Sequence, residues 1–214
     1  VRSCTVPEGV EFDRFQAPVD QSNAPSGRYI LSVGPIKERK GYAVSMEAFT
    51  LLKDEFPDLH YYVVGMIHEQ GFHQGLLEKL RAAGVMDRVH FLGQVPDDRL
   101  IALYRGCSAF TLTPLTVGTQ FEGFGLIYLE ANSCGKAVVG SRGCGAEEAI
   151  VDGETGYLVP AADPRAAAEA LRRLLLDPQL AARMGETGRE RARLMTWDVT
   201  ADKLIEQYRL GMSG

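Results

Sequence analysis

Short apolar segments alternate with helical patterns along most of this chain, and this alternation restricts the fold more than any other feature. The apolar segments are rich in β-branched and aromatic residues and are typical of buried strands. They span 28–34, 59–65, 88–93, 108–113, 136–141 and 155–160. Helical patterns span 42–56, 74–83, 99–105 and 126–133. Because parallel strands need helix-length crossovers, we expect an α/β, Rossmann-like, doubly wound sheet of roughly six parallel strands with helices on both faces.

The segment after the last strand, 163–214, has two or three further helical patterns. Neither a repeat nor a low-complexity tract nor a linker interrupts the sequence, so we expect one domain over 1–214. Two local details are also expected. The first helix should stop before Pro57, and Asp97 or Asp98 should cap the helix at 99–105.

Composition excludes several classes of protein. The formal net charge of −5 is unlike the basic surface of a nucleic-acid-binding domain. No apolar run is long enough to span a membrane, and the first residues do not resemble a signal peptide. Four scattered cysteines without a CxxC pair predict neither a zinc site nor a disulfide framework, and favour a cytoplasmic setting. They are Cys4, Cys107, Cys134 and Cys144.

Ligands of open parallel sheets bind at the carboxyl ends of the strands, so the loops there are the candidate binding loops. They are 34–41, 65–73, 93–98, 114–125 and 141–147. The first contains Lys37, Arg39 and Lys40, which could neutralise phosphates or form a solvated charged turn. The chain has neither the GxGxxG fingerprint of dinucleotide oxidoreductases nor a P-loop.

The stretch FEGFGLIYLE, 121–130, has one glutamate before a Gly-Phe-Gly turn and one after it. Gly123 and Gly125 allow close approach of a ligand, and the N–H groups of 124–126 begin a helix, which suits phosphate or sugar oxygens. Glu122 and Glu130 are separated by roughly 12 Å along the helix axis, about the span of a sugar nucleotide. The alternative is that Glu122 caps the helix and Glu130 is a surface residue.

Other residues have weaker patterns. The loops after the second and third strands could read a base edge, with Val95 as an apolar contact. Trp197 is expected in the core or as a helix-packing anchor. No Asp-x-Asp motif supports a metal–diphosphate site. The four histidines, expected to be structural or exposed, are His60, His68, His73 and His90.

Taken in order, the segments SVG…RKG, YYVVG, DRVHFLGQVPDD, LYRGCSAFTLTP, FEGFGLIYLEANSCGKAVVGS and VDGETGYLVP resemble the carboxyl-terminal domain of retaining GT-B glycosyltransferases. The narrower resemblance is to the group that includes bacterial mannosyl-, glucosyl- and N-acetylglucosaminyltransferases and sucrose-phosphate synthases. PEGVEFDRF, 7–15, resembles the segment after the interdomain connection. The resemblance therefore implies that 1–27 leads in from a missing N-terminal domain, and that 163–214 provides the C-terminal helices.

The resemblance also implies roles for individual positions. Glu122 would contact the donor sugar, Lys40 the diphosphate and Glu130 the ribose, with Gln94 and Val95 beside the base. Glu122 and Lys40 would be the catalytic residues, with no metal and no cofactor. The complete predicted donor-binding set is Gly34, Lys40, Gly65, Gln94, Val95, Glu122, Gly123, Phe124, Gly125, Leu126 and Glu130.

Two positions depart from the family pattern. Pro35 stands where a second phosphate-binding arginine is common, so either Lys37, Arg39 or Arg142 substitutes or diphosphate binding is weaker. Cys144-Gly145 replaces a usual Gly-Gly pair, which is a milder change.

The sequence thus predicts the donor-binding domain of a hexosyltransferase that uses a UDP- or GDP-sugar and an acceptor hydroxyl. The acceptor, whether lipid-linked, a saccharide or a small molecule, would bind the missing domain, so the 214-residue chain alone should be inactive. The full-length enzyme could lie at the inner membrane face without a transmembrane segment, and nucleic acid is not an expected partner. The alternative is a non-catalytic sugar-nucleotide-binding or interaction module.

Overall fold

All six predicted strands form, and they make one parallel sheet. The structure, a computed structural model, describes residues 6–212, so Cys4 lies outside the described residues. The sheet order is β3-β2-β1-β4-β5-β6. The strands are β1 (Tyr29–Val33), β2 (His60–Val64), β3 (Val89–Phe91), β4 (Ala109–Thr111), β5 (Val138–Ser141) and β6 (Gly156–Val159).

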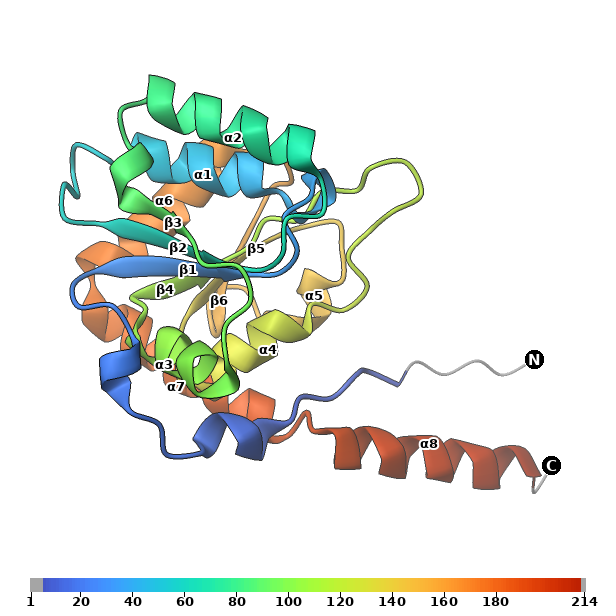
Figure 1. The fold of residues 1–214 in the computed structure, drawn as a ribbon. Helices are drawn as coiled ribbons and strands as arrows, with labels where there is room; N and C mark the ends of the chain where they lie inside the picture. The colour runs from blue at the N-terminus through green and yellow to red at the C-terminus, as the bar shows by residue number, and fades with distance from the viewer. Residues whose placement is uncertain (1–5, 213–214) are drawn as a thin grey trace.

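Helices cover both faces of this sheet, which confirms the predicted Rossmann-like fold class. In Figure 1, α1, α2 and α6 lie on one face, and α3, α4 and α7 on the other. The helices are α1 (Tyr42–Leu51), α2 (Gln70–Ala82), α3 (Asp97–Gly106), α4 (Leu126–Ser133), α5 (Ala146–Ala149), α6 (Pro164–Leu176), α7 (Pro178–Arg193) and α8 (Trp197–Met212). Short 3-10 helices span Phe12–Gln16, Gln21–Asn23, Glu38–Lys40 and Met86–Arg88.

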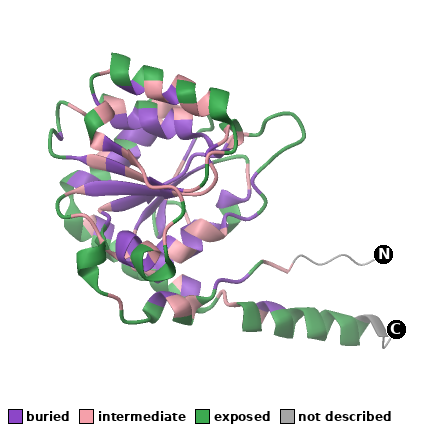
Figure 2. Ribbon diagram, in the orientation of Figure 1, coloured by how far each residue is buried: buried purple, intermediate pink, exposed green. Residues whose placement is uncertain are grey.

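The core lies on both sides of the central strands (Figure 2). Ile30 and Leu31 are neighbours on β1 that point to opposite faces, and both are completely buried. Buried tyrosines pack between the sheet and the helices, and their hydroxyl groups form hydrogen bonds there. Tyr29 donates to the Leu103 carbonyl of α3 at 2.8 Å, and Tyr61 donates to the Ser45 hydroxyl of α1 at 2.8 Å. Because the central strands are buried on both faces, their sequences are nearly continuous apolar runs.

Asp-Pro pairs set the start of α6 and α7. The Asp163 carboxylate accepts hydrogen bonds from the Arg165 and Ala166 N–H groups, both at 3.0 Å. Asp177 accepts from the Leu180 N–H at 2.8 Å. In each case proline takes the first helical position, where its missing N–H costs nothing.

Three expected details were wrong. The first helix ends at Leu51 rather than at 56, because the Leu52 and Lys53 N–H groups bond to carbonyls three residues back and tighten the last turn. The second helix begins at Gln70, four residues before the predicted start, since glycines in its first turns obscure the helical pattern. Neither Asp97 nor Asp98 caps α3; Pro96 is the N-cap, so both aspartates fall inside the first turn.

The N-terminal segment is joined to the junction between α7 and α8. The Val10 N–H donates to the Met195 carbonyl at 2.8 Å, and the Thr200 hydroxyl donates to the Pro7 carbonyl at 2.9 Å. From this junction α8 extends away from the sheet and is exposed along 201–210 (Figures 1 and 2). Trp197, expected in the core or as a helix-packing anchor, is 45% exposed at the start of α8, because this helix packs so little against the body.

Candidate functional site

The loops that follow β1 and β4 meet at the point where the strand order reverses, which is where open α/β sheets bind ligands. The Leu115 N–H donates to the Arg39 carbonyl at 2.8 Å, and the Thr113 hydroxyl donates to the Gly41 carbonyl at 3.0 Å. Gly41 has a φ of 70°, and a Cβ there would lie 1.7 Å from the Thr113 carbonyl oxygen. Only glycine allows this backbone contact, which holds the two loops together.

Three side chains from these loops form a buried ion-pair group, here called the Glu122 cluster, consisting of Glu122, Lys40 and Arg39. The Lys40 Nζ donates to both Glu122 carboxylate oxygens, at 2.9 and 2.7 Å. An Arg39 guanidinium nitrogen donates to one of them at 2.8 Å. The Lys40 and Glu122 side chains are only 9% and 10% exposed. Two cations facing one carboxylate leave a net positive charge at this position.

The start of α4 lies directly after Glu122 and presents free backbone donors. Within the described part of the chain, the N–H groups of Phe124, Gly125 and Leu126 have no hydrogen-bond acceptor. The backbone of Glu122 is fixed by a hydrogen bond, since the Gly145 N–H donates to the Glu122 carbonyl at 3.0 Å. The alternative in which Glu122 caps the helix is wrong, because α4 has no side-chain cap. Unpaired N–H groups at a helix start favour anions.

Glu130 lies further along α4 and faces α3. The Tyr104 hydroxyl donates to its Oε2 at 2.8 Å, and Oε1 has no hydrogen bond to a described residue. Burial raises the pKa of Glu130, while the Tyr104 hydrogen bond and Arg14 act in the opposite direction. Glu130 is half-buried, so it is not the surface residue of the alternative prediction.

Four predicted positions line one open cavity of about 530 Å³, here called the carboxyl-edge hollow, at the ends of β1, β2 and β3. They are Gly34, Gly65, Gln94 and Val95. A Cβ at Gly65, whose φ is 153°, would lie 1.9 Å from the Gly34 carbonyl oxygen, so these two strand ends also pack backbone to backbone. Pro35 lines the same hollow, and so do Met66, Leu100 and His68, which are not in the predicted donor-binding set. His68 was expected to be structural or exposed.

The structure thus groups the predicted residues into the Glu122 cluster, the α4 start, Glu130 and the hollow. Of the three cations considered as substitutes at Pro35, Arg39 joins the cluster, whereas Arg142 pairs with Asp152. Tyr104 was missed; the available signal was a tyrosine that ends the apolar run 100–103 of α3, since a buried hydroxyl needs a partner.

Two kinds of site are absent from residues 6–212. No group of three or more His, Cys, Asp or Glu side chains there could hold a metal ion. No helix among these residues is long and apolar enough to cross a membrane.

Comparison with known proteins places this chain in a family of enzymes. The sequence description of the glycosyl transferases group 1 family matches residues 13–191, and the chain is a member of that family. Among curated relatives, it is 34% identical over 194 residues to the GDP-mannose-dependent alpha-(1-6)-phosphatidylinositol monomannoside mannosyltransferase of Mycolicibacterium smegmatis. That match covers 86% of this chain and 50% of the relative. The chain spans about half the length of the curated relatives it matches.

Two solved structures support the same assignment. The C-terminal domain of a glycosyl transferase group 1 family protein (LpcC) from Francisella tularensis is 26% identical, with a TM-score of 0.67. The likeness covers 93% of this chain and 96% of that one. Sucrose-phosphate synthase from Thermosynechococcus elongatus is 29% identical with a TM-score of 0.79, over 97% of this chain and 52% of that one. The predicted relation to the carboxyl-terminal half of GT-B glycosyltransferases is confirmed.

Proposed function

We propose that this chain is the donor-binding domain of a glycosyltransferase that moves a hexose from a GDP- or UDP-sugar to an acceptor hydroxyl, with retention of the anomeric configuration. The observation that supports this most strongly is the net positive Glu122 cluster beside the free N–H groups of α4. Fixed cations and a helix start together suit a diphosphate.

In this proposal the donor lies across the carboxyl edge of the sheet. Its base occupies the carboxyl-edge hollow against Val95, and its ribose hydroxyls donate to the free oxygen of Glu130. The diphosphate lies between Lys40 and the start of α4, and the hexose lies at Glu122.

The transfer breaks the bond between the anomeric carbon and the diphosphate oxygen, while the acceptor oxygen forms the new bond and its proton is released. Negative charge grows on the departing nucleoside diphosphate. Lys40 and the α4 N–H groups stabilise this charge without moving, since they are already held in place. Glu122 orients the sugar and stabilises positive character at the anomeric carbon.

GDP-mannose is the first donor to test, because the mannosyltransferase relative is named as dependent on it. We propose that acceptor binding needs residues outside this chain, so that the 214-residue chain binds donor but transfers little. We further propose that no divalent metal or other cofactor is needed, because Lys40, Arg39 and the N–H groups surround the position proposed for the diphosphate. We also propose that the enzyme works in the cytoplasm.

Calorimetric titration with GDP-mannose, UDP-glucose, GDP and UDP tests the proposal. One nucleotide should be preferred, and chelation by EDTA should leave binding unchanged. Glu130→Ala should weaken binding about tenfold through loss of a charged acceptor. Glu206→Ala, an exposed site on α8, is the matched control. Equal binding of all nucleotides, or equal loss in both variants, would overturn the assignment.

The rival function is a non-catalytic sugar-nucleotide-binding module, and Pro35 is the observation in its favour. A transfer assay on a longer protein that includes the N-terminal half separates the two. Transfer to an acceptor supports the enzyme, whereas tight donor binding without transfer or donor hydrolysis supports the module.

A further inference from the structure

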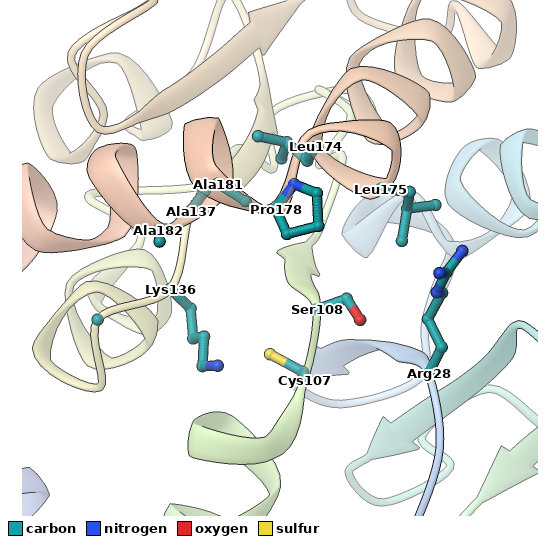
Figure 3. Close-up of a pocket in the computed structure, with 11 residues that line it drawn as sticks. Arg28, Cys107, Ser108, Lys136, Ala137, Leu174, Leu175, Pro178, Ala181 and Ala182 are labelled. Atoms are coloured by element: carbon teal, nitrogen blue, oxygen red, sulfur yellow. The ribbon is translucent and has the colours of Figure 1, made fainter.

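A second cavity lies at the opposite edge of the sheet from the proposed donor site. This amino-edge cavity has a volume of about 250 Å³ and is formed where β1, β4 and β5 begin, under the connection from α6 to α7 (Figure 3). Its lining residues are Arg28, Cys107, Ser108, Gly135, Lys136, Ala137, Leu174, Leu175, Pro178, Ala181 and Ala182.

Two cations, Lys136 and Arg28, are among the polar groups that line this cavity, and only Arg28 has a carboxylate partner. The Lys136 ammonium has no hydrogen bond or ion pair with any residue in 6–212. The Arg28 guanidinium has its nearest carboxylate, Asp58, at 3.9 Å and otherwise lies over the Phe56 ring at 5.6 Å. No Asp or Glu side chain lines the cavity. Figure 3 shows Lys136 and Arg28 on opposite sides of the Cys107–Ser108 segment.

The remaining walls are apolar. Leu174, Leu175 and Ala181 are almost fully buried and face the cavity from the two helices. Burial also raises the pKa of the Cys107 thiol to about 12, so this side chain is a neutral wall and not a nucleophile. A ligand that fits this cavity therefore needs both an apolar body and a negatively charged group.

We infer that the amino-edge cavity binds a small organic anion, in which a carboxylate or phosphate monoester head is attached to a short apolar body. Lys136 takes the charged head, and the α6–α7 connection covers the body. At about 30 Å³ of liquid volume per water molecule, the cavity holds a ligand of roughly eight non-hydrogen atoms. The site is independent of the donor function, because none of its lining residues belongs to the Glu122 cluster or the carboxyl-edge hollow.

Four probes distinguish the contribution of the charged head from that of the apolar body: hexanoate, butyl phosphate, inorganic phosphate and 1-hexanol. Titrations followed by amide chemical shifts should show one saturable site, with shifts at Ser108, Lys136 and the α6–α7 connection. Hexanoate or butyl phosphate should bind at least tenfold more tightly than phosphate or hexanol, and whichever binds more tightly identifies the head group. Binding should be unchanged by saturating GDP-mannose.

Two variants test the assignment of residues. Lys136→Gln should weaken binding of the preferred probe roughly tenfold by removing the charged donor. Ala182→Leu should weaken it by filling the cavity from an exposed rim position, where the fold tolerates a larger side chain. Lys203→Gln on α8 is the matched charge control. Equal affinity in Lys136→Gln and Lys203→Gln, or hexanol binding as tightly as the anions, would overturn the inference.

Discussion

The two edges of the sheet both carry a lysine and an arginine, but they hold them differently. At the carboxyl edge, Lys40 and Arg39 are fixed by the Glu122 carboxylate and the loops that carry them touch through their backbones. At the amino edge, Lys136 and Arg28 face a cavity without any carboxylate in its lining. The first arrangement is ordered before a ligand arrives, whereas in the second Lys136 has no carboxylate partner among the described residues and Arg28 has only Asp58, at 3.9 Å.

The largest difference should appear when one charge is removed from each edge. Glu122→Ala leaves Lys40 buried without a partner, and breaking a buried pair in this way costs about 3 kcal/mol of unfolding free energy. Lys136→Gln removes a cation that has no partner and should change stability by less than about 0.5 kcal/mol. Urea unfolding of both variants measures the two values. Equal losses would mean that the Glu122 cluster is not the more rigid of the two sites.

Backbone packing gives the next largest difference in stability between the two edges. Gly41 at the carboxyl edge and Gly84, on the connection that leads to the amino end of β3, both have a φ of 70°. Gly84→Ala meets nothing within 4 Å and should cost about 1 kcal/mol from the left-handed conformation alone. Gly41→Ala adds a clash with the Thr113 carbonyl, and overpacking costs roughly 1–3 kcal/mol more. Unfolding curves that coincide would show that the loop contact is loose.

These two edges also show what the sequence could and could not predict. The strands were predictable because the central ones, β1, β4 and β5, are buried on both faces and therefore have a local apolar signature, as in 28–34. The Lys40–Glu122 pair joins residues 82 positions apart, and no local pattern contains such a contact. The motifs RKG and FEGFG, which contain Lys40 and Glu122, could each be recognised in the sequence. That the two residues pair with each other depends on the strand order. The amino-edge cavity depends on α6 and α7 closing over three strand starts, so it had no signature at all.

A smaller effect tests whether Arg39 compensates for Pro35. Its side chain is 20% exposed and reaches Glu122 from the solvent side, so Arg39→Gln should leave the Lys40–Glu122 pair intact. We expect GDP-mannose affinity to fall about fivefold, the value of one partly exposed charged contact to phosphate. Arg28→Gln at the amino edge is the control and should not change donor affinity. If the two variants bind donor equally well, Arg39 is not the missing cation.

The smallest expected effect concerns the pH dependence of stability at Glu130. Burial raises its pKa in the folded state, so the protein binds this proton more tightly when folded. The stabilisation is fully present below the ordinary glutamate pKa of 4.5 and is lost as pH rises through the folded-state value. Glu130→Gln keeps an acceptor for the Tyr104 hydroxyl but cannot ionise. The variant should therefore match the wild type at low pH and gain in relative stability towards neutral pH, as measured by urea unfolding across this range. A constant difference would show that Glu130 titrates alike in the folded and unfolded states, and that burial of its carboxylate carries no desolvation cost.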